Sequence, residues 1–241
     1  MPVSPIELAV ALVVTAAAAV VQGTIGIGFG VLSVPILSLV NPILAPVPQL
    51  LLAVPLAMSM AWRERSHIES RGVVWLLAGR IPGAIIGLGL IAVATQRALD
   101  VGIALSVLVA VAILGTGITV QRTPPAEFGT GVVAGVMGMV ASMGGPPAAL
   151  LFKDAKGAIV RSTLALFFSF GLVVTVLARV AGGRMTGDDI TLTLLLSPGF
   201  IIGYVASSRL RARADASAIR PAILAISSLA AVGLLVRAVV G

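Results

Sequence analysis

The stretch Pro82-Gly83-Ala84-Ile85-Ile86-Gly87 recurs 116 residues later as Pro198-Gly199-Phe200-Ile201-Ile202-Gly203. At the same offset Arg63 recurs as Arg179 and Gly117 as Gly233. A chain that repeats itself in this way contains two similar halves, which we expect to span residues 1–120 and 121–241. Apolar halves that are interrupted by glycine and proline are typical of secondary transporters, which bind their substrate between the repeats.

A second repeated feature is an apolar run broken by glycines. In the first half it reads Gly23-Thr24-Ile25-Gly26-Ile27-Gly28-Phe29-Gly30, and near an offset of 115 its counterpart is Gly138-Met139-Val140-Ala141-Ser142-Met143-Gly144-Gly145-Pro146-Pro147. Glycines at every second position suit neither an uninterrupted helix nor one packing ridge. We therefore expect each half to begin with a broken helical segment, followed by three transmembrane helices.

The composition defines the class of protein. The chain is 59% hydrophobic and 10% charged, with a mean hydropathy of +1.14, whereas soluble domains carry about 25% charged residues. We predict an all-α polytopic membrane protein, with lipid as its surroundings. The net charge of +7 comes from basic residues between the apolar segments, where the positive-inside rule explains them without a nucleic-acid partner.

The apolar segments fall into two sets of five. We expect them at 5–22, 28–40, 49–62, 72–94 and 99–120, and at 128–141, 146–160, 161–181, 189–208 and 217–240. The segments on either side of each glycine break are too short to cross a hydrocarbon core about 30 Å thick at about 1.5 Å per residue. The distribution of basic residues among the loops then decides whether each broken segment crosses the membrane once or forms a re-entrant hairpin.

The distribution of Lys and Arg favours hairpins. If each broken segment crosses once, the basic residues of the loops and termini divide 8 to 7 between the two sides, whereas hairpins give 11 to 4. The second division obeys the positive-inside rule, with both termini outside and the 63–71, 121–127, 153–161 and 209–220 loops in the cytoplasm. Three crossings per half then require that the two halves are inverted relative to each other.

The glycine breaks are the first candidate for a binding site. Helices that restart near Phe29 and Pro146 would present free N–H groups and a positive dipole end to the middle of the membrane, which suits an anion. Gln22, Thr24 and Ser142 lie beside the breaks and can satisfy freed backbone groups. The alternative is that glycines only allow close helix packing. We prefer packing for Gly83/Gly87 and Gly199/Gly203, and binding for the breaks.

Arg80 is the second candidate, because it is the one basic residue that we place deep inside a span. Such residues usually face a bundle interior or a transport pathway. Three roles remain open for the Arg80 side chain: it draws an anion, it snorkels to the inner interface, or it bonds to backbone carbonyls at the Pro82 kink. The repeat partner of Arg80 is Leu196, so this charge is not duplicated.

Acidic and metal-binding residues are sparse. We expect no Asp or Glu inside a span, which disfavours proton coupling through a membrane carboxylate. There is no cysteine, and the single His67 lies in a charged loop. No cofactor or metal site is expected, and an enzyme would need reactive groups that the spans lack.

The chain resembles the sulfite exporter TauE/SafE family over nearly its whole length. The resemblance lies in the two glycine breaks, in Val34-Pro35 after the first break, and in the recurrent Pro-Gly-x-x-x-Gly. The resemblance implies a permease of a prokaryotic inner membrane for small sulfur-containing anions such as sulfite or organosulfonates. Carried onto this chain, it implies a site lined by Gly26, Gly28, Gly30, Ser142, Gly144, Gly145 and Pro146.

Other readings remain at this point. An anion channel or pore of the same architecture fits the same residues. A cation carrier fits poorly, because Arg80 is the deep charge. Small residues on many helix faces permit a monomer or a homodimer equally.

Overall fold

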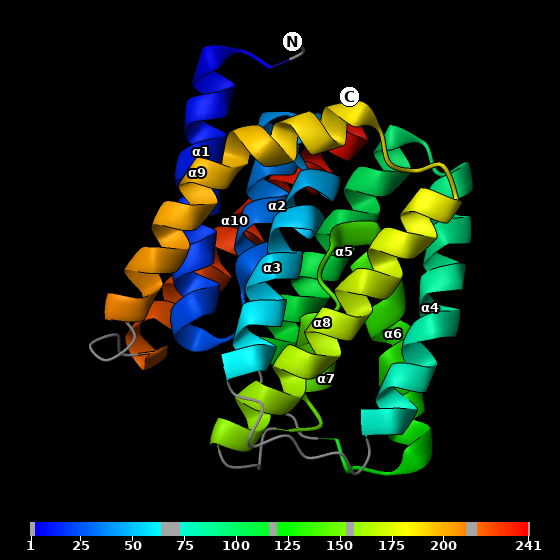
Figure 1. Ribbon diagram of the computed structural model, residues 1–241. Helices are drawn as coiled ribbons and strands as arrows, with labels where there is room; N and C mark the ends of the chain where they lie inside the picture. The colour runs from blue at the N-terminus through cyan, green and yellow to red at the C-terminus, as the bar shows by residue number, and fades with distance from the viewer. Residues whose placement is uncertain (1–2, 64–72, 116–119, 153–156, 211–215, 241) are drawn as a thin grey trace.

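The computed structural model describes residues 3–63, 73–115, 120–152, 157–210 and 216–240, and every regular element in these ranges is a helix. His67 and the basic residues of 64–72, 153–156 and 211–215 lie outside the described ranges. In chain order the elements are α1 Pro5–Ile25, α2 Phe29–Val40, the short 3-10 helix η1 Pro42–Leu44, α3 Val47–Arg63, α4 Val73–Val93, α5 Gln96–Gly115, α6 Pro124–Ala141, α7 Gly145–Ala149, α8 Gly157–Ala181, α9 Gly187–Leu210 and α10 Ala216–Val240 (Figure 1).

Among the described residues, seven helical stretches are long and apolar enough to span a membrane. They are Pro5–Ile25, Pro42–Arg63, Val73–Val93, Gln96–Gly115, Ser162–Ala181, Gly187–Leu210 and Arg220–Val240. Large apolar side chains on these helices, such as Leu229 and Val93, are exposed, as is usual where lipid tails replace water. The protein is an all-α integral membrane protein, as predicted, and each half has a broken segment followed by three long helices.

The second arm of the second break is shorter than the predicted segment 146–160. Helix α7 ends at Ala149, and the N–H groups of Leu150 and Leu151 then bond to carbonyls three residues back, at 3.2 and 3.1 Å. Such tight turns commonly end a helix. The predicted segment also contained Lys153 and Lys156, so its apolar character was not continuous. Helix α8 begins instead at Gly157.

The repeated Pro-Gly-x-x-x-Gly motif packs each half against the other. Helix α4 lies along α6, and α9 lies along α1. A Cβ added at Gly83 would lie 2.2 Å from the carbonyl oxygen of Val132 in α6, and one at Gly203 would lie 2.2 Å from that of Ala16 in α1. These backbones approach so closely that only glycine fits. The packing role that we preferred for these glycines is confirmed.

The directions of the helices place the chain ends together. In Figure 1 the N- and C-terminal ends lie at one edge of the bundle, while α3 ends and α4, α6 and α8 begin at the opposite edge. This is the placement that the hairpin topology requires. The inversion of one half relative to the other, and the edge that faces the cytoplasm, stay predictions.

Cysteine labelling tests that topology. Ala98, in the first turn of α5, and Gln121, before α6, are both exposed. Because the native chain has no cysteine, Ala98→Cys and Gln121→Cys each introduce a single thiol. We expect an impermeant thiol reagent applied to whole cells to label position 98, and to label position 121 only after the cells are opened. Equal labelling of both in whole cells would contradict the topology.

Candidate functional site

The first break is produced by two glycines with left-handed backbone. Helix α1 ends at Ile25, and Gly26 follows with φ 95°, donating its N–H to the carbonyl of Gln22 at 2.8 Å. Gly28 has φ 131° and precedes the first residue of α2. Side chains with a Cβ rarely adopt such backbone angles. The sequence therefore interrupts the helix here by local conformational preference alone.

Gln22 joins the two arms of this break. Its side-chain oxygen accepts the N–H of Phe29 at 2.8 Å, and the side chain is 7% exposed. The first hydrogen bond within α2 runs from Leu32 to the carbonyl of Gly28. The N–H groups of Gly30 and Val31 consequently have no partner within the helix, as is general for a first turn.

The second break is arranged differently. Ser142 follows α6 with φ 54° and donates its hydroxyl to the carbonyl of Pro46 at 3.0 Å. Helix α7 has five residues, and Pro146 and Pro147, near its start, have no N–H. The predicted helix start near Pro146 is present, but so short a helix has only a small dipole. The positive end that we expected from a long helix at this break is therefore absent.

The two breaks meet in the interior of the bundle. A Cβ added at Gly30 would lie 2.9 Å from the carbonyl oxygen of Ser142, and one at Gly145 would lie 2.8 Å from the ring of Phe168. Between them is a cavity of about 50 Å³. At about 10–15 Å³ for each water, this space holds about three to five water molecules.

Arg80 reaches this cavity from α4. It is 1% exposed, so it does not snorkel to the interface. Its Nη1 donates to the carbonyls of Ala134 at 2.9 Å and Gly144 at 3.3 Å, and its guanidinium lies 5.1 Å from the ring centroid of Phe167. Its Nε is buried without a hydrogen-bond partner. The carbonyls that it contacts belong to α6 and the second break, not to the Pro82 kink.

Three glycines make room for the guanidinium. A Cβ added at Gly144, Gly171 or Gly138 would lie 1.9, 2.2 or 2.7 Å from its nearest nitrogen. These glycines come from the second break, α8 and α6, so the space is shared among three elements. A helix-packing role does not require glycine at all three positions around one charged group.

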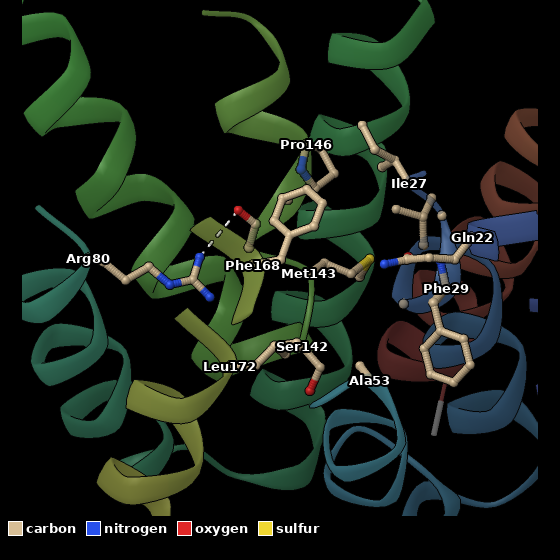
Figure 2. Close-up of a pocket in the computed structure, with 15 residues that line it drawn as sticks. Gln22, Ile27, Phe29, Ala53, Arg80, Ser142, Met143, Pro146, Phe168 and Leu172 are labelled. Carbon is tan, nitrogen blue, oxygen red and sulfur yellow. Dashed lines mark hydrogen bonds between the residues drawn. The ribbon is translucent and has the colours of Figure 1, made fainter. Parts of the chain in front are cut away.

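Figure 2 shows how the lining residues lie. Arg80 and Gln22 approach from opposite sides, the Arg80 guanidinium reaches the Gly144 carbonyl, and the side chains of Met143 and Phe168 are drawn between them. The amide nitrogen of Gln22 points toward Met143. The hydrogen-bond donors of Arg80, from α4, and of Gln22, beside the first break, thus approach the site from opposite sides.

Most of the predicted site residues line this cavity. They are Gln22, Gly28, Gly30, Arg80, Ser142, Gly144, Gly145 and Pro146. Thr24 and Gly26 do not: the Thr24 hydroxyl bonds back to the carbonyls of Val20 and Val21, at 2.8 and 3.0 Å, and Gly26 caps α1. The sequence analysis missed Phe168 and Gly171. An aromatic residue and a glycine in α8 carry no signal of their own without the packing of α8 against the breaks.

The charges of the interior also differ from the prediction. Asp100 is the fifth residue of the span α5 and is 4% exposed, and Glu127 lies in the first turn of α6 and is 5% exposed. Our expectation of no carboxylate inside a span was therefore wrong for Asp100. Arg237 pairs with Asp100 at 2.6 Å, and Arg122 pairs with Glu127 at 3.2 Å. Neither carboxylate lines the central cavity.

A second basic residue is buried besides Arg80. Arg179, near the end of α8, is 5% exposed and donates its Nη2 to the Met139 carbonyl. Arg179 lies near the end of the predicted segment 161–181, a position from which an arginine side chain can snorkel to either interface. Its depth is set by the packing of α8 on α6, so position along the chain alone does not reveal it.

Long apolar helices with a small cavity between two broken segments make up a polytopic membrane protein, and this arrangement is typical of secondary transporters. The chain matches the family model described as Sulfite exporter TauE/SafE over residues 10–234. The protein belongs to this family of membrane transporters, whose description names sulfite export. Searches among curated proteins and among solved structures found no match.

Proposed function

We propose that this protein is a secondary transporter that exports small sulfur-containing anions, such as sulfite or organosulfonates, across a prokaryotic cytoplasmic membrane. The termini lie outside the cell. The substrate binds in the middle of the membrane, in the cavity where the two breaks meet. Family membership supports the transporter class and the sulfur-anion chemistry. The observation that carries the site is Arg80, which is buried at this cavity without a carboxylate partner among the described residues.

The groups around the cavity favour an anion over a cation. Arg80 contributes a positive charge, and the N–H groups of Gly30 and Val31 contribute donors at the first turn of α2. The buried carboxylates lie elsewhere and are neutralised by Arg237 and Arg122. An anion that accepts these hydrogen bonds would satisfy donors that otherwise lose free energy when buried.

The size of the cavity favours a compact oxyanion in this conformation. A space for about three to five waters is comparable to sulfite, which has four non-hydrogen atoms. A bulky organosulfonate would require the lining side chains, chiefly Phe168 and Met143, to move. Sulfite is therefore the first substrate to test.

We favour a carrier over a channel or pore because the cavity is small and contacts between its lining elements narrow it in this conformation. The contact between the Ser142 hydroxyl and the Pro46 carbonyl joins the second break to the segment before α3, and Phe168 closes on Gly145. Countertransport separates the two classes: external sulfite should accelerate release of labelled internal sulfite through a carrier. A channel would show no such acceleration.

The membrane potential is sufficient as a driving force for export. An anion that leaves a negative-inside cell gains about 2.3 kcal/mol per charge per 100 mV. Both buried carboxylates are engaged in ion pairs, so neither is placed as a proton relay at the site. We expect sulfite flux to follow the imposed potential and to be independent of a pH gradient.

The direct test is flux of labelled sulfite from proteoliposomes. We expect saturable flux from the native chain and a loss of at least about tenfold in Gly145→Val. The added side chain would meet the Phe168 ring, starting at 2.8 Å from Cβ, and would occupy part of a cavity of about 50 Å³.

The matched control for this variant is Gly129→Val in α6, because a Cβ there meets nothing within 4 Å. We expect its flux to equal that of the native chain. Unchanged flux in folded Gly145→Val would remove Gly145 from the site, and no flux of any sulfur oxyanion through the native chain would refute the proposed substrate class.

A further inference from the structure

A larger cavity lies apart from the central one. Its volume is about 420 Å³, and its wall includes the connection between α2 and α3, the start of α5, the end of α8 and the start of α9. It belongs to the edge of the bundle where the chain ends lie (Figure 1). Its lining is largely apolar but includes the charged residues Arg179, Asp188 and Asp189, and nothing in the central site accounts for such a cavity in this place.

Two residues in the lining of this cavity each have a buried polar atom without a hydrogen-bond partner. Arg179 is 5% exposed, and its Nε has no hydrogen-bond partner although its Nη2 donates to the Met139 carbonyl. Ser38 is 1% exposed, and its hydroxyl also has no partner. Nearly all buried polar groups in proteins are hydrogen-bonded, so two unpaired groups on one cavity indicate a ligand. Arg179 can only donate, which selects a ligand that accepts.

The acidic residues at this cavity do not reverse that preference. Asp188 is exposed, so water screens its charge. The carboxylate of Asp189 accepts both the N–H and the hydroxyl of Thr186, each at 2.8 Å. Arg184 is exposed as well and donates to the Ala92 carbonyl at 2.7 Å. Arg179 is therefore the most deeply buried charge among the described residues of this cavity, and Asp189, which is half-buried, lies near enough to act on it electrostatically.

The larger cavity adjoins the central one at the end of α6. Val140 lines the larger cavity and Ser142 lines the central one. Pro46 lines the larger cavity, and its carbonyl accepts the Ser142 hydroxyl at 3.0 Å. Both buried arginines contact α6: Arg179 donates to the Met139 carbonyl, and Arg80 donates to the Ala134 carbonyl. The hydrogen bond between Ser142 and Pro46 thus joins the lining of the central cavity to that of the larger one.

We infer that the larger cavity is a second anion site, an antechamber that holds a small oxyanion on Arg179 between the solution at the terminal edge and the central cavity. This inference rests on the proposed function for its place in transport. The anion-selective character of the cavity does not depend on which anion is carried. Opening of the contact between Ser142 and Pro46 would join the two sites.

The test uses one thiol placed beside Arg179. Val140 is 9% exposed and follows Met139, the residue whose carbonyl Arg179 contacts. In Val140→Cys, we compare reaction rates with an anionic sulfonatoethyl and a cationic trimethylammonioethyl methanethiosulfonate, each normalised to a small free thiol in solution. The cysteine-free native chain supplies the background. We expect the anionic reagent to be favoured.

Removing the charge should remove the preference. A unit charge about 6 Å away in a water-like dielectric changes the local concentration of a charged reagent about threefold, in opposite directions for the two reagents. Adding Arg179→Gln to Val140→Cys should therefore lower the anion-to-cation rate ratio about tenfold. Arg179→Lys keeps the charge and should preserve the ratio. Arg184→Gln, which removes an exposed charge at the same cavity, should change the ratio less than twofold.

Each outcome decides the inference. An unchanged ratio in Arg179→Gln would overturn it, as would a cationic preference in Val140→Cys alone, or no reaction at all while Ala98→Cys reacts. If Arg179→Gln does not fold, the ratio in Val140→Cys with native Arg179 still decides. If the native chain shows no sulfite flux but Val140→Cys still prefers the anionic reagent, the proposed function is refuted and the second anion site is retained. If the native chain transports sulfite but Val140→Cys does not prefer the anionic reagent, the second anion site is refuted and the proposed function is retained.

Discussion

Replacing Arg80 with glutamine is expected to lower sulfite flux by at least about a hundredfold and to leave the thermal stability of the protein unchanged or higher. The reduction follows because the charge at the central cavity disappears, and a desolvated site depends on such a charge more than an aqueous one does. Stability is retained because a buried arginine without a carboxylate carries a desolvation cost of several kcal/mol. Glutamine removes that cost and can still donate a hydrogen bond.

The matched control is Arg237→Gln, which removes an arginine that has a carboxylate partner. Arg237 contacts Asp100 at 2.6 Å and also donates to the Ser38 carbonyl at 2.7 Å. Its loss leaves the buried Asp100 carboxylate without its ion-pair partner, although Gln96 still donates to it at 3.0 Å, and should destabilise the fold by about 1–3 kcal/mol. Flux per folded molecule should remain. Flux in proteoliposomes and thermal unfolding in detergent, measured on both variants, separate the two kinds of arginine.

The opposite result for Arg80 would be informative. A folded Arg80→Gln chain with native flux would assign Arg80 to the stabilisation of the α6 carbonyls. A marked loss of stability with flux retained per folded molecule would support the same conclusion. Arg80→Lys distinguishes further, because lysine keeps the charge but lacks the planar fork that contacts the carbonyls of Ala134 and Gly144.

Substituting alanine for Gly83 is expected to destabilise the protein by about 1–3 kcal/mol, whereas the same change at Gly89 should stabilise it by up to about 1 kcal/mol. Both glycines lie in α4, where alanine is intrinsically the better helix former. The expected changes in stability have opposite signs because a Cβ at Gly83 would meet the Val132 carbonyl oxygen at 2.2 Å, while a Cβ at Gly89 meets nothing within 4 Å. Overpacking against a backbone cannot be relieved by a rotamer change.

Gly203→Ala repeats this test at the other contact between the halves. Its Cβ would lie 2.2 Å from the Ala16 carbonyl, so we expect a destabilisation similar to that of Gly83→Ala. Unfolding in detergent of the three variants provides the measurement. Equal effects at Gly83 and Gly89 would contradict the close packing of α4 on α6.

Much of the architecture was predictable from the sequence because its causes are local. Gly26 and Gly28 interrupt the first segment through their own backbone angles, and the long apolar runs identify spans through the cost of placing polar groups in lipid. The predicted break, helix start at Phe29 and packing glycines are present. The predicted second arm 146–160 was wrong because an apolar count over a window concealed the tight turn after Ala149 and the lysines beyond it.

The sequence by itself determined that this protein is an all-helical membrane protein with two broken segments, and it singled out Arg80 as an unusual charge. Only the tertiary structure decided what surrounds that charge. The Gly144 carbonyl is 64 residues from Arg80 along the chain, and the Pro46 carbonyl is 96 residues from Ser142. Contacts over such separations depend on how helices pack, and the same packing buries Arg179 and brings the two breaks together. Hydropathy and glycine content report the preference of each segment for lipid or for a bend, but they contain no distance between segments.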